Sequence, residues 1–170
     1  MYIGRGQIAN LLVKNQLKLA SAESCTGGMI AAACTDLAGS SAWFERGFVT
    51  YSNEAKTQML SVDAALITQH GAVSEAVARA MAQGVVSHSQ AQVAVAVTGV
   101  AGPTGGSAAK PVGTVWFGFV TPAGVVTEMQ HFAGDRAAVR TATVEHAFER
   151  LLALLTALPV QPVQPARLEP

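Results

Sequence analysis

A chain of 170 residues in which 50% of the side chains are hydrophobic and 13% are charged is long enough for one buried core and too apolar to be disordered. Its formal net charge is zero, so it lacks the basic surface that attraction to nucleic acid or to an anionic membrane requires, and we expect neither partner. A small anionic metabolite fits this charge balance better than a polymer.

The first half of the chain alternates between extended and helical patterns. Residues 1–17 have the spacing of an amphipathic helix and not the organisation of a signal peptide, which predicts a cytoplasmic protein. A strand is expected over residues 17–24, and it runs into two glycines and a helix over residues 25–37. A second strand is expected over residues 44–52. Three further helices are expected at 52–60, 62–71 and 74–89.

The second half opens with a continuous apolar strand over residues 92–99, typical of a central strand buried on both faces. It ends in a glycine-rich loop over residues 100–111, and chemistry in α/β sheets gathers at such strand ends. Residues 112–132 have the pattern of an antiparallel hairpin, and residues 135–158 have the pattern of a long closing helix.

These elements predict a single α/β domain over residues 1–158 and a flexible proline-rich tail over residues 159–170. No apolar run reaches the about 20 residues that a membrane-spanning helix needs. The apolar composition favours a homo-oligomer, with a dimer as the first expectation. Two cysteines and four scattered histidines show no metal-ligand spacing, so neither a catalytic metal nor a cofactor is expected.

Three residues in the stretch from Ser41 to Lys56 could together form an activated nucleophile without histidine or metal. Ser41 would attack, a partly desolvated Lys56 would take its proton, and Tyr51 could relay or donate that proton. The structural alternative makes Ser41 a helix cap, Tyr51 a half-buried strand residue and Lys56 a solvated helix residue.

The segment from Ser24 to Gly28 bridges a strand and a helix. Its hydroxyls and the backbone N–H groups around Thr26, Gly27 and Gly28 could form a nest for a phosphate at the helix N-terminus. The alternative is an ordinary tight turn with a capping hydroxyl. Cys25 could itself be a nucleophile, but no histidine is identifiable as its partner, and thiols in such turns are usually inert.

Further candidates follow the buried strand. Thr98 and Gly99 begin a glycine-rich stretch that is not a P-loop and could cover a ligand or simply connect two strands. Arg136 and Arg140 are four residues apart and therefore share one face of the last helix. They could clamp a phosphate or carboxylate, or pair with glutamates.

Taken together, several ordered motifs resemble the CinA C-terminal domain family, the nicotinamide-nucleotide amidohydrolases. The motifs are SAESCTGG, AGSSAWFERGFVTYSNEAK, HGAVSE, VTGVAGPTGGSAAKPVGTVWF and FAGDRAAVR. The resemblance implies a three-layer α/β/α sandwich with a mixed sheet. It also implies hydrolysis of the carboxamide of nicotinamide mononucleotide to nicotinate mononucleotide and ammonia, in cytoplasmic recycling of pyridine nucleotides.

The functional positions that the resemblance implies are Ser24, Ser41, Tyr51, Lys56, Thr98 and an arginine, with Arg140 preferred over Arg136. Ser41 is the preferred nucleophile, with Lys56 as general base and Tyr51 assisting. Ser24 and the 26–28 turn would bind phosphate or stabilise an oxyanion, and exchange of the roles of Ser24 and Ser41 stays open. The alternative function is a catalytically silent nucleotide-binding or regulatory module linked to competence and DNA damage.

Overall fold

The computed structural model describes residues 4–159, so all of the expected tail except Pro159 lies outside the described residues. The strands are β1 (Leu19–Glu23), β2 (Phe44–Val49), β3 (Val93–Gly99), β4 (Thr114–Thr121) and β5 (Gly124–His131). The helices are α1 (Arg5–Lys14), α2 (Met29–Thr35), α3 (Asn53–Leu60), α4 (Ala64–His70), α5 (Glu75–Ser87) and α6 (Arg136–Thr156), with a short 3-10 helix, η1, at Ser40–Ala42.

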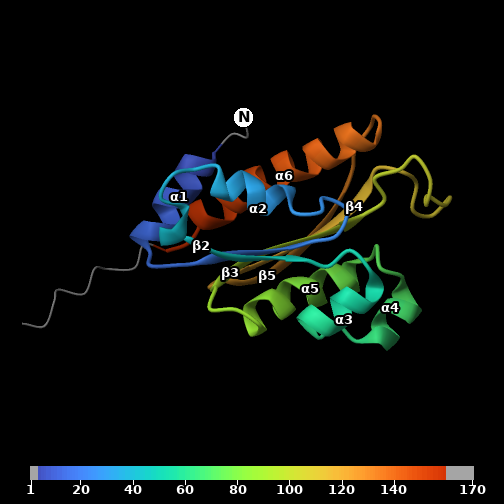
Figure 1. Cartoon of the computed structure of the whole chain (residues 1–170), viewed down its shortest axis with the longest axis horizontal. Coiled ribbons are helices and arrows are strands. Elements are labelled where there is room, and N and C mark those ends of the chain that lie inside the picture. The colour runs from blue at the N-terminus through green and yellow to red at the C-terminus, as the bar shows by residue number, and fades with distance from the viewer. Residues whose placement is uncertain (1–3, 160–170) are drawn as a thin grey trace, which may run out of the picture.

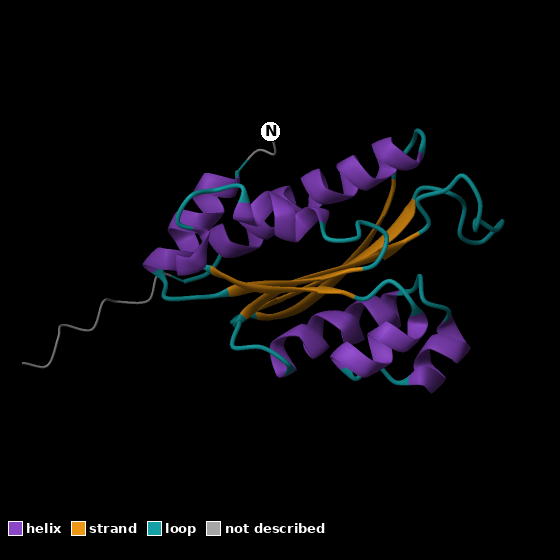
Figure 2. Cartoon of the chain, viewed as in Figure 1, coloured by secondary structure: helices purple, strands orange, loops and turns teal. Residues whose placement is uncertain are grey.

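All five strands form one sheet in the order β2-β1-β3-β4-β5 (Figure 2). The first three strands are parallel, and β4 and β5 form an antiparallel hairpin against β3. The expected mixed sheet is therefore confirmed. Its parallel half depends on the helices between the strands, because parallel neighbours need a crossover connection.

Helices cover both faces of the sheet, which confirms the three-layer sandwich. Figure 1 shows α1, α2 and α6 on one face and α3, α4 and α5 on the other. Two hydrophobic clusters separate accordingly: one contains Leu19 of β1 with Phe148 of α6, and the other contains Ala20 and Ala22 of β1 with Met81 of α5. The alternation along β1 thus divides its side chains between the two layers.

Close backbone approach determines how α5 lies on the sheet. A Cβ on Gly118 of β4 would lie 2.3 Å from the carbonyl oxygen of Ala78, and one on Gly84 would lie 2.3 Å from that of Leu60. Both glycines therefore allow α5 to pack against its neighbours at a distance that no larger residue permits. Within residues 4–159, no helix combines the length and hydropathy needed to cross a bilayer.

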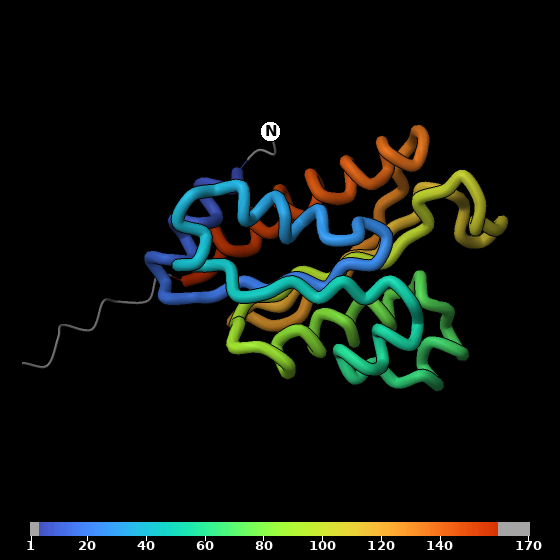
Figure 3. Tube along the Cα trace, viewed as in Figure 1, coloured from blue at the N-terminus to red at the C-terminus, as the bar shows by residue number. Residues whose placement is uncertain are grey.

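The parallel strands bring three turns to one end of the sheet. Glu23 at the end of β1 is in register with Val49 of β2 and with Val97 of β3. Figure 3 shows the turns that follow these strands gathering at the same end of the molecule. Side chains just after β1, β2 and β3 are therefore neighbours in space, as is usual for ligand sites of α/β sheets.

Candidate active site

A cavity of about 280 Å³ opens at this end of the sheet. Its lining comes from the turns after β1, β2 and β3, from the first turn of α3, from the α4–α5 connection and from the start of α6. The lining residues are Ser24, Cys25, Tyr51, Asn53, Lys56, Ala72, Val73, Thr98, Gly99, Ala101 and Arg136. Five of the residues predicted from the sequence thus meet at one cavity: Ser24, Tyr51, Lys56, Thr98 and Gly99.

Ser24 and Lys56 form the centre of the site. Nζ of Lys56 lies 3.0 Å from Oγ of Ser24. Lys56 also donates to the carbonyl oxygens of Thr50, at 2.9 Å, and Tyr51, at 3.2 Å. These two carbonyls, with that of Ser52 at 3.5 Å, hold the amine in place. Ser52 also caps α3 through the N–H of Ala55, which fixes where the helix that carries Lys56 begins.

Burial controls the protonation of this lysine. Lys56 is 1% exposed, and no acidic side chain forms an ion pair with it in the described part of the chain. Removal from water disfavours the charged form and lowers the pKa of Lys56 below its usual value, opposed only in part by the Cys25 thiol. A lysine with a lowered pKa loses its proton at a lower pH than a solvated lysine does, and it is therefore better able to accept a proton from a hydroxyl.

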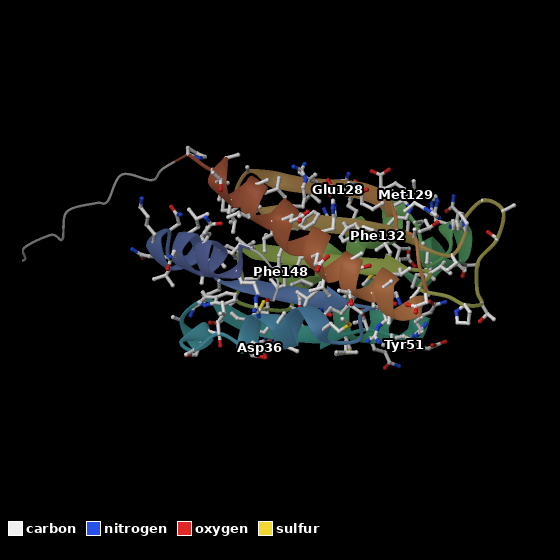
Figure 4. The ribbon with its side chains drawn as sticks, turned by 90° about the horizontal axis from the view of Figure 1, so that it is seen from above. Asp36, Tyr51, Glu128, Met129, Phe132 and Phe148 are labelled. Carbon is white, nitrogen blue, oxygen red and sulfur yellow. The ribbon has the colours of Figure 1, made fainter. Side chains whose placement is uncertain are left out.

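Ser41 is not brought to this cavity. It is an exposed residue of η1, before β2 begins, and its carbonyl oxygen accepts a hydrogen bond from Lys18 at 3.2 Å. Lys56 follows the other end of β2, so roughly 16 Å of strand separates the two ends. Figure 4 shows Tyr51 at one end of the molecule and Asp36, which ends α2 shortly before η1, toward the other. The structure thus does not bring Ser41, the preferred nucleophile, to Lys56, and the serine that contacts Lys56 is Ser24.

The other predicted residues that line the cavity are Tyr51, Thr98 and Gly99, and they differ in exposure and in contacts. Tyr51 is 63% exposed at the rim, and it contacts Lys56 through its backbone carbonyl. Thr98 is 1% exposed and donates to the carbonyl oxygen of Ala72 at 2.9 Å, so it holds the α4–α5 connection against the site. A Cβ on Gly99 would lie 2.7 Å from Cγ2 of Val115, which explains a glycine there.

The turn formed by residues 24–28, called here the Ser24 turn, is already occupied by a protein carboxylate. Glu23 accepts hydrogen bonds from the hydroxyl of Thr26 and from the N–H of Gly28. The N–H of Gly27 donates to the carbonyl oxygen of Ser24. The structure does not support the predicted phosphate nest, because the Thr26 hydroxyl and the N–H groups of Gly27 and Gly28 are bound within the protein and these residues do not line the cavity.

The two arginines of α6 have different surroundings. Arg140 donates from Nε to the carbonyl oxygen of Cys25, at 3.1 Å, and from Nη2 to that of Thr26, at 3.0 Å. Arg136 lines the cavity, is exposed, and donates from Nη1 to the carbonyl oxygen of Gly102 at 3.0 Å. Both arginines line an adjoining hollow of about 640 Å³, but only Arg136 also lines the cavity that holds Ser24 and Lys56. The arginine placed to meet a ligand in the cavity is therefore Arg136, whereas Arg140 braces the Ser24 turn.

At Cys25, the backbone N–H is better suited to the chemistry of the cavity than the thiol is. Burial raises the pKa of the Cys25 thiol to about 11, so the thiolate is scarce at neutral pH. The carbonyl of Ser24 accepts from Gly27 inside the turn, and in a trans peptide the following N–H points the opposite way. The N–H of Cys25 is therefore not used by the hydrogen bonds of the turn, and it interacts with the sulfur of Cys25 itself.

Glu23 is the site residue that the sequence analysis missed. An acidic residue placed directly before a Ser-Cys-Thr-Gly-Gly turn, at the end of a strand predicted to be buried, was the available signal. Among residues 4–159 no group of three or more His, Cys, Asp or Glu side chains is placed to hold a metal ion. The chemistry that these residues offer is nucleophilic, with a serine and a lysine in contact.

Known proteins resemble nearly the whole described chain. A family model for the CinA C-terminal domain matches residues 4–155. The nicotinamide-nucleotide amidohydrolase PncC of Escherichia coli K12 is 52% identical over 146 residues, which cover 85% of this chain and 88% of that protein. The protein of the same name from Pseudomonas putida is 55% identical over 139 residues, covering 82% and 87%.

Solved structures agree in fold. A CinA superfamily protein from Klebsiella pneumoniae 700603 superposes with a TM-score of 0.87 at 38% identity, covering 91% of this chain and 96% of that one. A competence/damage inducible protein from Agrobacterium tumefaciens superposes with a TM-score of 0.82 at 45% identity, covering 91% and 98%. Sequence and structure therefore point to one family.

Proposed function

We propose that this chain, which belongs to the CinA C-terminal domain family, hydrolyses the carboxamide of nicotinamide mononucleotide to nicotinate mononucleotide and ammonia. The observation that carries the proposal is the 3.0 Å contact between Ser24 and the buried Lys56 inside a cavity. A serine beside a desolvated lysine is suited to acyl transfer, and the relatives named above are amidohydrolases.

The first half of the reaction uses Lys56 as a base. In its neutral form the amine of Lys56 has two N–H groups, which donate to the carbonyl oxygens of Thr50 and Tyr51. Its lone pair is then free to accept a hydrogen bond from the hydroxyl of Ser24. The proton of Ser24 passes to Nζ while Oγ bonds to the carboxamide carbon. As the C–N bond breaks, Lys56 returns the proton to the leaving nitrogen, which departs as ammonia.

The second half repeats these steps with water. Water gives a proton to Lys56 as it attacks the ester carbon, the bond to Oγ breaks, and Ser24 recovers its proton from Lys56. The product leaves as the carboxylic acid, which releases its remaining proton to solvent and becomes nicotinate mononucleotide. The negative oxygen of each tetrahedral intermediate needs a donor, and we assign this role to the backbone N–H of Cys25, a residue that lines the cavity. Removal of one such donor typically costs about 10²–10³ in rate.

The phosphate of the nucleotide is assigned to Arg136. Its guanidinium lines both the cavity and the adjoining hollow, and only Nη1 is committed to a protein carbonyl. A phosphate bound there would leave the nicotinamide ring free to enter the cavity beside Ser24. The assignment predicts a strong preference for the mononucleotide over free nicotinamide, because the latter forgoes a charge-assisted contact. The recycling role, the cytoplasmic location and the homodimer stay predictions from the sequence.

The test is ammonia release from nicotinamide mononucleotide by the wild-type protein and by three folded variants. Ser24→Ala and Lys56→Ala should abolish turnover, whereas Ser41→Ala should keep it, since Ser41 lies beyond the far end of β2. Turnover that survives in Ser24→Ala and vanishes in Ser41→Ala would contradict the mechanism. A wild-type protein that binds the nucleotide without releasing ammonia would be a binding module.

A further inference from the structure

Glu23 is a buried charge that the mechanism above does not use. It is 1% exposed, and it takes part in no ion pair in the described residues. Burial of a carboxylate without a cation is costly unless hydrogen bonds replace its water. Glu23 directly precedes Ser24, so its carboxylate is placed to act on the turn that carries the proposed nucleophile.

Hydrogen-bond donors surround both oxygens of this carboxylate. Oε2 accepts from the Thr26 hydroxyl at 2.7 Å and from the N–H groups of Gly28 at 3.1 Å and Ile30 at 2.9 Å. Oε1 accepts from the N–H of Ala31 at 2.8 Å, with the Ser21 hydroxyl at 3.3 Å. The three backbone donors belong to the start of α2, whose capping residue Gly28 has no side chain of its own to satisfy them.

The carboxylate therefore joins the two ends of the Ser24 turn. Glu23 is the last residue of β1, and its bonds run across the turn to the first residues of α2. Successive side chains of a strand point to opposite faces, so Ser24 projects away from Glu23 and toward Lys56. Arg140 braces the same turn through two of its carbonyls.

We propose that Glu23 is a positioning residue that holds the Ser24 turn closed, so that Oγ of Ser24 faces Lys56 and the N–H of Cys25 faces the reacting carbonyl group. This inference rests on the proposed function in so far as it concerns turnover. Its physical basis is that a nucleophile must be held close to its base and to the oxyanion donor, and a displacement of about 1 Å can cost on the order of 10²-fold in rate.

Two variants weaken this network to different degrees. Glu23→Gln replaces one acceptor oxygen by an NH₂ group, which opposes at least one backbone N–H. Thr26→Val removes only the hydroxyl that bonds Oε2, and Thr26 is 0% exposed. Thr143→Val is the matched control, because Thr143 is also 0% exposed and its hydroxyl bonds only the carbonyl of Val139 within α6.

A fluorophosphonate probe separates position from folding. The probe forms a bond from Oγ of Ser24 to phosphorus, fluoride leaves, and the proton passes to Lys56, so labelling counts competent sites without requiring amide hydrolysis. Ser24→Ala checks that the label is on Ser24. Labelling rate, and kcat and KM for nicotinamide mononucleotide per labelled site, are then measured beside the melting temperature.

Glu23→Gln should lower both the labelling rate and kcat per labelled site on the order of 10²-fold, with KM changed by less than about threefold. Thr26→Val should show a smaller loss in the same direction, and Thr143→Val should match the wild type. If Glu23→Gln does not fold, the labelling rate and kcat of Thr26→Val test the inference in its place.

Three outcomes would contradict the inference about Glu23, the proposed function, or both. Variants that melt earlier but keep the wild-type rates per labelled site would make Glu23 a fold-stabilising cap and overturn the inference. A wild-type protein that labels without releasing ammonia would refute the proposed function alone, since the labelling rates still test Glu23. A wild-type protein that does not label would overturn both.

Discussion

Replacement of Lys56 by methionine tests whether the lysine is held neutral by burial. The lowered pKa means that the folded protein releases this proton at a lower pH than the unfolded chain does. Between the lowered pKa and the unfolded value of about 10.4, the unfolded state binds more protons, so the folding stability of the wild type rises with pH. Lys56→Met has no such group, so the stability of the wild type relative to the variant should rise with pH.

The slope of that difference is set by one proton. It amounts to about 1.4 kcal/mol per pH unit between the two pKa values and falls to zero on either side. The variant also leaves the carbonyls of Thr50 and Tyr51 without their donor. This loss does not depend on pH, so it shifts the stability difference by a constant amount and leaves its slope unchanged. Other titrating groups are common to both proteins, and Cys25, which interacts with Lys56, has a pKa of about 11, above the pH range measured.

Urea unfolding of both proteins, measured between about pH 6 and pH 10, gives the difference directly. The wild-type profile of kcat/KM against pH gives a second value, because activity should fall as Lys56 is protonated on the acidic side. The two experiments should yield the same pKa. Parallel stability curves, or an acidic limb unrelated to the stability curve, would refute a neutral buried Lys56 as the base.

Four further substitutions separate contacts within the site from contacts beyond it. Arg136→Ala should raise KM for the nucleotide about tenfold or more, with little effect on the melting temperature. Arg140→Ala should instead lower both kcat and the melting temperature. Equal effects of the two variants on KM would contradict this division of roles. Cys25→Ala should keep kcat within about threefold, and the wild-type thiol should resist iodoacetamide near pH 8, because its pKa is about 11; rapid alkylation of Cys25 would argue against this. Gly84→Ala should lower the free energy of unfolding by at least about 1 kcal/mol, since its Cβ would meet the Leu60 carbonyl, and a more stable variant in urea titration would show that this packing is looser than described.

Much of the fold follows from local patterns in the sequence. The continuous apolar run of β3 and the β-branched hairpin of β4 and β5 indicate a mixed sheet, and the structure has these strands where the pattern predicts them. The helices expected at 52–60, 74–89 and 135–158 begin where the sequence predicts, because Ser52, Ser74 and Asp135 cap them. These features depend on neighbours within a few residues, which is why the sequence alone determines them.

The partner of Lys56 depended on tertiary structure. Ser41 is closer to Lys56 along the chain than Ser24 is, and proximity in sequence favoured it. A strand runs between Ser41 and Lys56 and carries them to opposite ends of the sheet, whereas parallel pairing of β1 with β2 brings Ser24 to Lys56. Strand order and direction are properties of the whole sheet, and no local pattern encodes them.

The composition of the chain determined that a lysine, a serine and a glycine turn were available for chemistry. Only the tertiary structure decided that the turn binds Glu23 instead of a phosphate, and that Arg140 braces this turn while Arg136 lines the cavity. The physical reason is that buried polar groups must find partners, and those partners come from elements that the fold brings together over long distances in the sequence.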